Sequence, residues 1–166
     1  MPIQNGINVD FSPLELGYPS ACLLEAGLPN LPIQMAIRRL VAKKLQSNHP
    51  FPLYAVVSMP EYIGDPIAVF QSKTRRDCLV ILTEMEYKEN NLVVIIEPDK
   101  KFEDSRFNSV RSVYPKDNFK DVLKWVCEDI LMRYYNKEKI LKWLDKQQSN
   151  SADVIQLLKD CIKIIK

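Results

Sequence analysis

The sequence has few of the residues that several common functional sites require. It contains four glycines in 166 residues, and neither GxGxxG nor GxxxxGKS/T occurs, which excludes the usual glycine-rich phosphate-binding loops. Its single histidine and scattered carboxylates offer too few ligands for a dedicated metal site, so we expect no metal and no other cofactor. The four cysteines include no CxxC pair and therefore fit zinc and redox motifs poorly.

Charge of one sign and long apolar runs are also scarce. The formal net charge is +2 and the isoelectric point about 8.3, which excludes a strongly cationic protein that coats nucleic acid but permits a local basic groove. No apolar run approaches the ~20 residues that span a membrane, and residues 1–10 lack the basic and apolar regions of a signal peptide. We therefore expect a cytoplasmic protein whose cysteines are reduced and lie in the core.

What the sequence contains is an ordinary globular composition, with 46% hydrophobic and 27% charged residues. The length suits a single domain over residues 1–166. Four runs have the apolar patterns of strands, at residues 67–71, 78–84, 92–97 and 107–114. Because the connections between these runs are short, we predict a four-stranded antiparallel meander with a polar hairpin loop at residues 87–91.

Helices are predicted before and after these strands, which gives an α+β fold with N-terminal helices, a central four-stranded antiparallel meander and C-terminal helices. The N-terminal helices are expected after Ser12, at residues 20–26, over residues 33–45 and over residues 53–58. The C-terminal helices are expected at residues 117–134, 136–147 and 151–166, with Asn136 and Ser151 as N-caps of the last two.

Several phrases follow one another in a set order between residues 12 and 145. They are LGYP at 16–19 with LLEAGLPNLPI at 23–33, MPEYIGDPIAVFQS at 59–72 after His49, LVILTE at 79–84, NSVRSVYPKD at 108–117, and the spaced residues Trp125, Leu131, Tyr134, Asn136, Lys137 and Lys139. Together these phrases resemble the C-terminal domain of phage MuF-like proteins. Tyr18 departs from the small hydroxyl residue of the family's pattern, and residues 151–166 form an additional helix outside the resemblance.

The resemblance implies a function as well as an origin in phages or other mobile elements. The family is grouped by analogy with small nucleases of the barnase, EndoU, colicin and RelE type, in which helices precede a four-stranded antiparallel sheet. The resemblance thus implies a metal-independent ribonuclease or toxin-like effector domain that cleaves RNA by general acid–base chemistry. The partners expected for such a domain are RNA and a protein partner or inhibitor, and no membrane.

Cleavage of RNA needs a base for the 2′-hydroxyl proton, an acid for the leaving oxygen, and cations that stabilise the charged phosphorane. The one histidine, His49, suits either proton role because an imidazole has an ordinary pKa of about 6.5, although a histidine that ends a helix can be purely structural. The catalytic candidates are His49, Ser72, Ser112 and Tyr114, and the substrate-binding candidates are Lys43, Lys73, Thr74, Asn108 and Lys116. Period two along the fourth strand predicts that Asn108, Ser112 and Tyr114 share one face.

Two alternatives stay open. The first is a non-catalytic protein-interaction module, for which Phe51, Tyr54 and Tyr62 would supply an exposed apolar patch, although packing in the core is the more usual role of such residues. The second is a nuclease fold that has lost catalysis and still binds nucleic acid. In a purely structural interpretation, residues 72–74 are a solvated turn and the cations of residues 38–44 a solvated helix face.

Overall fold

The computed structural model describes residues 3–4, 7–8, 12–36, 54–75, 77–116, 122, 125, 132–147, 153, 155–157 and 159–160. The strands are β1 (Ile3–Gln4), β2 (Ile7–Asn8), β3 (Leu14–Glu15), β4 (Ile33–Met35), β5 (Ala68–Gln71), β6 (Leu79–Tyr87), β7 (Asn90–Phe102), β8 (Ser105–Pro115) and β9 (Met132–Tyr135). The helices with described bounds are α1 (Ala21–Glu25), α3 (Tyr54–Gly64) and α5 (Lys137–Lys146). Residues 122, 125, 153, 155–157 and 159–160 are also helical.

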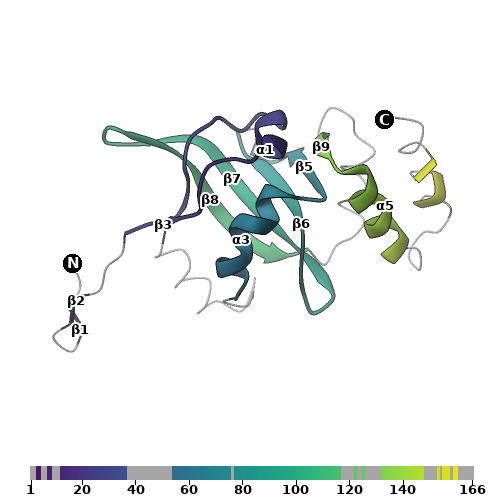
Figure 1. Cartoon of the computed structure of the whole chain (residues 1–166), viewed down its shortest axis with the longest axis horizontal. Helices are drawn as coiled ribbons and strands as arrows, with labels where there is room; N and C mark the ends of the chain where they lie inside the picture. Colours follow the sequence, from purple (N-terminus) through teal and green to yellow (C-terminus); the bar gives the residue numbers. More distant parts are fainter. Residues whose placement is uncertain are drawn as a thin grey trace.

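The centre of the described structure is a seven-stranded mixed sheet with the strand order β3-β4-β8-β7-β6-β5-β9. Strands β5 to β8 are antiparallel neighbours in chain order, and Figure 1 shows the long β7–β8 hairpin extending beyond the other strands. Strand β4 is parallel to β8, whereas β3 and β9 pair antiparallel with β4 and β5. A separate two-stranded sheet joins β1 and β2.

The predicted fold, a four-stranded meander with N-terminal helices, is therefore wrong. Residues 33–35, predicted as the start of a helix, form β4 because their backbone pairs with β8, where the Asn108 N–H donates to the Pro32 carbonyl at 2.8 Å. Residues 14–15 form β3 on the outer side of β4. Residues 132–135, predicted as the end of a helix, form β9, which pairs with β5. Long-range backbone hydrogen bonds thus override the local helical spacing.

Helices α1 and α5 lie where the sequence predicted them. The Ser20 hydroxyl caps α1, and the chain turns at Gly27 with a φ of +102°. The Asn136 side chain accepts from the Lys139 N–H at 3.0 Å and so caps α5. Helix α3 is longer than predicted and contains Pro60. None of the helices within the described ranges is long and apolar enough to cross a membrane.

Other parts of the predicted helices cannot be compared with the structure. The remainder of the predicted 33–45 helix beyond Ala36, and residues 117–121, 126–131 and 161–166 of the predicted C-terminal helices, lie outside the described residues.

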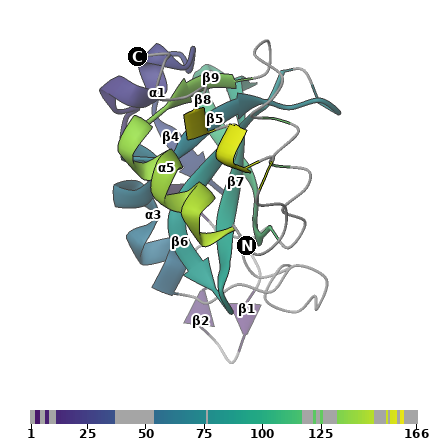
Figure 2. The same ribbon diagram turned by 90° about the vertical axis from the view of Figure 1, so that its right-hand side faces the viewer.

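Side chains alternate between the two faces of the sheet and form two apolar clusters. The α1/α3 face is built from Leu79, Ile81, Leu92, Val94 and Ile96, covered by Leu23, Ala55, Met59 and Ile63. The α5 face is built from Phe70, Val80, Leu82 and Val93, covered by Ile140, Trp143, Leu144 and Ile155. Figure 2 shows the helical residues 153, 155–157 and 159–160 beside α5. Burial of each large aliphatic side chain contributes about 1.5–3 kcal/mol, so both faces stabilise the sheet.

A β-bulge in β8 changes which face of the sheet its side chains reach. Ile96 on β7 pairs with Val110, and the adjacent Ile95 pairs with Ser112, so Arg111 is an extra residue on β8. Even-numbered residues before the bulge therefore share the α1/α3 face with Val110. Even-numbered residues after the bulge share the α5 face instead.

The described cysteines are free thiols, Cys78 buried and Cys22 half-buried. Burial raises the pKa of the Cys78 thiol. The Cys22 thiol donates to the Tyr134 hydroxyl at 3.2 Å and so links α1 to β9. Burial, together with this hydrogen bond, raises the pKa of Tyr134 to about 12. Cys127 and Cys161 lie outside the described residues.

Candidate functional site

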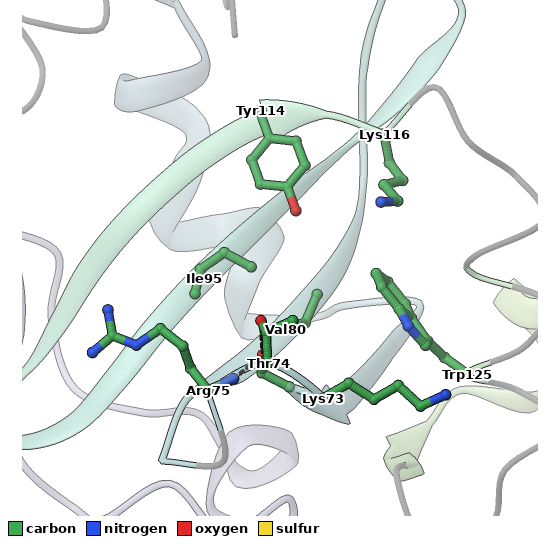
Figure 3. A pocket seen from close by; sticks show the side chains of 9 residues that line it. Lys73, Thr74, Arg75, Val80, Ile95, Tyr114, Lys116 and Trp125 are labelled. Carbon is green, nitrogen blue, oxygen red and sulfur yellow. Dashed lines mark hydrogen bonds between the residues drawn. The ribbon is translucent and has the colours of Figure 1, made fainter.

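The α5 face of the sheet holds an open pocket of about 440 Å³ (Figure 3). Its lining comes from the loop after β5, from the faces of β6 and β7, from the end of β8, and from one helical residue beyond β8. The lining residues are Ser72, Lys73, Thr74, Arg75, Val80, Ile95, Tyr114, Lys116 and Trp125.

Backbone hydrogen bonds fix the β5–β6 loop at one side of the pocket. The Ser72 N–H donates to the Cys78 carbonyl at 3.0 Å, and the Cys78 N–H donates to the Arg75 carbonyl at 2.9 Å. The Arg75 N–H also donates to the Ser72 hydroxyl at 3.1 Å, so Ser72 stabilises the turn itself. The two residues between them, Lys73 and Thr74, are exposed at the pocket.

Strand β8 and Trp125 form the opposite side of the pocket. Tyr114 pairs with Val93, which places its side chain on the α5 face, and Figure 3 shows its hydroxyl pointing into the pocket. The Lys116 ammonium lies 5.2 Å from the centre of the Trp125 ring, within the range of a cation–π interaction. The Trp125 ring in turn contacts the buried Phe70 ring, with 5.5 Å between their centroids.

The charges that line the pocket are positive. They belong to Lys73, Arg75 and Lys116, and within the described part of the chain no carboxylate lines the pocket. The Arg75 guanidinium lies 3.8 Å from Glu97 and 4.0 Å from Asp77, and in Figure 3 it points away from the centre of the pocket. The two lysines therefore give the pocket mouth a potential that favours an anionic ligand.

The pocket brings together five of the residues that the sequence suggested as a site, namely Ser72, Lys73, Thr74, Tyr114 and Lys116. They come from two segments separated by β6 and β7. Ser112 lies opposite Ile95 on the same face of the sheet but does not line the pocket. Lys43 and His49 lie outside the described residues.

The structure places Asn108 away from the pocket. The prediction that it shares a face with the later polar residues of β8 is wrong, because the bulge intervenes and turns them to the opposite face. The fully buried Asn108 amide donates to the carbonyls of Pro29 and Leu31 at 2.9 and 3.0 Å. Its side-chain oxygen accepts from the Asp99 N–H at 3.2 Å. Asn108 thus joins three backbone segments and has a structural role.

Two lining residues with functional groups, Arg75 and Trp125, were not among the predicted site residues. The apolar spacing of the helix predicted at residues 117–134 indicates that Trp125 packs in the core. In the structure its ring does contact Phe70. The charged run that begins at Lys73 was the one local signal for Arg75. The apolar lining residues of β6 and β7 carry the ordinary pattern of a sheet interior, so no local signal distinguished them.

Two other kinds of site were considered from the sequence, a metal site and an exposed aromatic patch. Within the described ranges, no group of three or more His, Cys, Asp or Glu side chains is placed to hold a metal ion. Tyr62, which could have supplied an exposed aromatic patch or packed in the core, is half-buried against the cluster of the α1/α3 face. Phe51 and the side chain of Tyr54 lie outside the described part of the chain.

Comparisons with known proteins bear on the family but not on the activity. Neither the curated proteins nor the solved structures gave a significant match. The sequence model of the phage MuF C-terminal domain family matches residues 40–142, more than half of the chain. This match confirms the family that the ordered phrases predicted, whereas the grouping with small nucleases is not confirmed. The chain belongs to the phage MuF C-terminal domain family.

Proposed function

We propose that this domain binds RNA in the pocket and cleaves it without a metal ion, as a ribonuclease or toxin-like effector of phage origin. The main support is the meeting of Lys73 and Thr74 with Tyr114 and Lys116 around one pocket whose described charged residues are all cations. Cations and hydroxyls gathered in this way are the groups that contact phosphates in nucleic-acid complexes. The free thiols of Cys22 and Cys78 suit a cytoplasmic location, where RNA is available.

The proposed reaction is the transfer of a phosphodiester from its 5′-oxygen to the neighbouring 2′-oxygen. A base removes the 2′-hydroxyl proton, the 2′-oxygen bonds to phosphorus, and the 5′-oxygen leaves with a proton from an acid. Lys73 and Lys116 would stabilise the extra negative charge of the phosphorane, and the inward-pointing Tyr114 hydroxyl would donate a proton or hydrogen bond. The products are a 2′,3′-cyclic phosphate and a free 5′-hydroxyl.

The base is assigned to His49 on chemical grounds. Among the lining residues that the structure describes there is no histidine and no carboxylate, and these are the common bases at neutral pH. His49 is the one histidine in the sequence. Its assignment therefore predicts a rate that rises with pH as the imidazole loses its proton, around its ordinary pKa of about 6.5.

Cleavage of a fluorescent single-stranded RNA by the full chain tests this proposal. We expect wild type to release a 2′,3′-cyclic phosphate, and His49→Ala to lower the rate by about 100-fold or more, as for loss of a general base. Tyr114→Phe should lower the rate of cleavage by a larger factor than it lowers the affinity for uncleavable 2′-O-methyl RNA. As a matched control, Tyr87→Phe alters a half-buried tyrosine of β6 that does not line the pocket and should have no effect. Full activity of the His49→Ala variant would contradict the assignment of His49 as the general base.

A second candidate function is binding of nucleic acid without cleavage. The observation that favours it is the composition of the described lining, which combines cations and aromatic rings and, among the described residues, includes no group that is a base at neutral pH. Tight binding of 2′-O-methyl RNA, together with no cleavage of the same unmodified sequence by wild type between pH 5 and 9, would establish this candidate over the first.

A further inference from the structure

We infer that the pocket takes single-stranded RNA, with one base unstacked from its neighbours and laid against Trp125. This inference rests on the proposed binding of RNA and adds the form of RNA that fits. It depends on features that phosphate binding alone does not require, namely the apolar floor of the pocket and the exposed part of an aromatic ring.

The floor of the pocket is apolar, and the two lysines lie beside it. Val80 and Ile95 lie on neighbouring strands of the sheet and line the pocket between the β5–β6 loop and the end of β8. Figure 3 shows the Lys73 and Lys116 side chains on the Trp125 side of this floor. A bare phosphate gains nothing from an apolar floor, whereas a nucleotide places its base on such a surface and its phosphate beside the cations.

The position of the Trp125 ring suits stacking with a flat ligand. Contact with the fully buried Phe70 holds the indole in place from the core side. Its outer part lines the pocket and is half-buried, so part of the ring is available to a ligand. Bases stack on aromatic side chains of this kind in proteins that bind single strands, with little dependence on base identity.

Lys116 connects the two parts of the ligand. Its ammonium now lies over the Trp125 ring, 5.2 Å from the ring centre. A base that stacks on this ring would take the place of the ammonium, and the lysine side chain is long enough to turn to the adjoining phosphate instead. Base stacking and phosphate binding would thus occur together, because stacking displaces the Lys116 ammonium from the ring and the phosphate then binds that ammonium.

A duplex does not satisfy these contacts. Its bases are paired and stacked on one another, so it presents phosphates, sugars and base edges but no free base face. A pocket of about 440 Å³ also falls within the usual range for one small ligand, and it suits a single nucleotide rather than the width of a double helix. The two lysines would still attract duplex phosphates, which gives a weaker, salt-sensitive contact.

The test compares one short 2′-O-methyl RNA strand, which cannot be cleaved, with the same strand annealed to its complement. We expect the single strand to bind the full chain about tenfold or more tightly than the duplex. Trp125→Leu retains apolar packing on Phe70 and should lower single-strand affinity about tenfold while leaving duplex affinity unchanged. Trp125→Tyr, which restores an aromatic face, should recover most of the loss.

A spectroscopic signal separates stacking from a general effect on the fold. The sequence has two tryptophans, so a Trp143→Phe background leaves Trp125 as the sole indole fluorophore. The single strand should quench this fluorescence, whereas neither the duplex nor inorganic polyphosphate should do so. Equal affinities for single strand and duplex, or an unchanged single-strand affinity in Trp125→Leu, would overturn the inference alone. Failure of both RNA forms to bind would overturn the proposed function with it.

Discussion

The two halves of strand β8, on either side of the bulge at Arg111, carry similar polar side chains with different tasks. Asn108 precedes the bulge, is fully buried, and joins three backbone segments on the α1/α3 face. Tyr114 follows the bulge, is half-buried, and lines the pocket on the α5 face. The degree of burial and the position relative to the bulge, rather than the type of residue, thus distinguish the structural Asn108 from the pocket-lining Tyr114.

The largest difference between the two halves should appear in stability. We expect Asn108→Ala to lower the free energy of unfolding by about 2–4 kcal/mol, because it removes a fully buried amide that donates to the carbonyls of Pro29 and Leu31 and accepts from the Asp99 N–H. Ser112→Ala, on the other side of the bulge, should cost about 1 kcal/mol or less. Urea denaturation of both variants measures this difference.

The Asn108→Ala variant should leave ligand binding at the pocket unaffected. Folded Asn108→Ala protein should retain RNA affinity, because Asn108 lies on the face opposite the pocket. Equal losses of stability in the two variants would contradict the division of β8 at its bulge.

A smaller effect on stability is expected at Lys139, which joins α5 to the sheet. Its ammonium donates to the Asp65 carbonyl at 2.8 Å and pairs with the Asp65 and Glu84 carboxylates at 2.8 and 2.5 Å. Lys139→Ala should cost about 1–2 kcal/mol, since Lys139 is largely buried but both carboxylates are well exposed to solvent. Lys142→Ala, a control on the same helix with an exposed ion pair to Glu138, should cost well under about 1 kcal/mol.

The contribution of Lys139 should also depend on pH. Partial burial lowers the pKa of its ammonium, but hydrogen bonds and charges from Asp65 and Glu84 outweigh burial and raise the pKa overall. A raised pKa in the folded state means that the stabilisation is fully present below the ordinary lysine value of about 10.4 and is lost as pH rises through the folded value. The stability difference between wild type and Lys139→Ala should therefore shrink above about pH 10.

The smallest expected effect is at Asp99, beside the structural half of β8. The Arg106 guanidinium donates to the Asp99 carboxylate at 2.7 Å, and this hydrogen bond holds the pKa of Asp99 below its ordinary value. The interaction is therefore present above the ordinary aspartate pKa of about 3.9 and is lost as pH falls through the lower folded value. An NMR titration of the carboxyl should show the pKa returning to the ordinary value in Arg106→Ala. An unchanged pKa in that variant would contradict this cause.

Part of the fold was accessible from the sequence because it depends on local patterns. Near-continuous apolar runs located the central strands at residues 79–87 and 90–102, and the polar loop between them forms a tight turn. Lys88 and Glu89 adopt φ values of 51° and 70° in that turn. Positive φ values at both positions are typical of two-residue hairpin turns, whose backbone matches the right-handed twist of the flanking strands. Asn136 also capped its helix as predicted.

The remaining strands depend on partners far away in the sequence. Residues 33–35 and 132–135 occur in apolar segments with helical spacing, and short segments of this kind do not distinguish helix from strand. Backbone pairing with β8 and β5 decides their structure. The bulge at Arg111 likewise has no local signature, and a shift of one residue exchanges the faces of every side chain beyond it.

The residue types of the candidate site were predictable from local patterns, but their arrangement in space was not. A run of hydroxyl and cationic residues marked Lys73 and Thr74, and the family-like phrase at residues 108–117 marked Lys116, but their proximity follows from the antiparallel order of β5 to β8. Trp125 could not be recognised, because an aromatic residue on the apolar side of a helix has the same pattern whether or not part of its ring lines a pocket.

Binding of a short single-stranded 2′-O-methyl RNA at increasing salt tests the central claim, that this pocket is the nucleic-acid site, most directly. The Lys73→Ala/Lys116→Ala variant should lose about tenfold or more in affinity, and its dependence of log K on log salt should decrease by about 1.4, as expected for two lost phosphate contacts on a single strand. Lys101→Ala/Lys142→Ala removes the same charge at exposed positions outside the pocket and should change affinity by about twofold or less. Equal losses of affinity in the two double variants would show that the chain binds RNA without using this pocket.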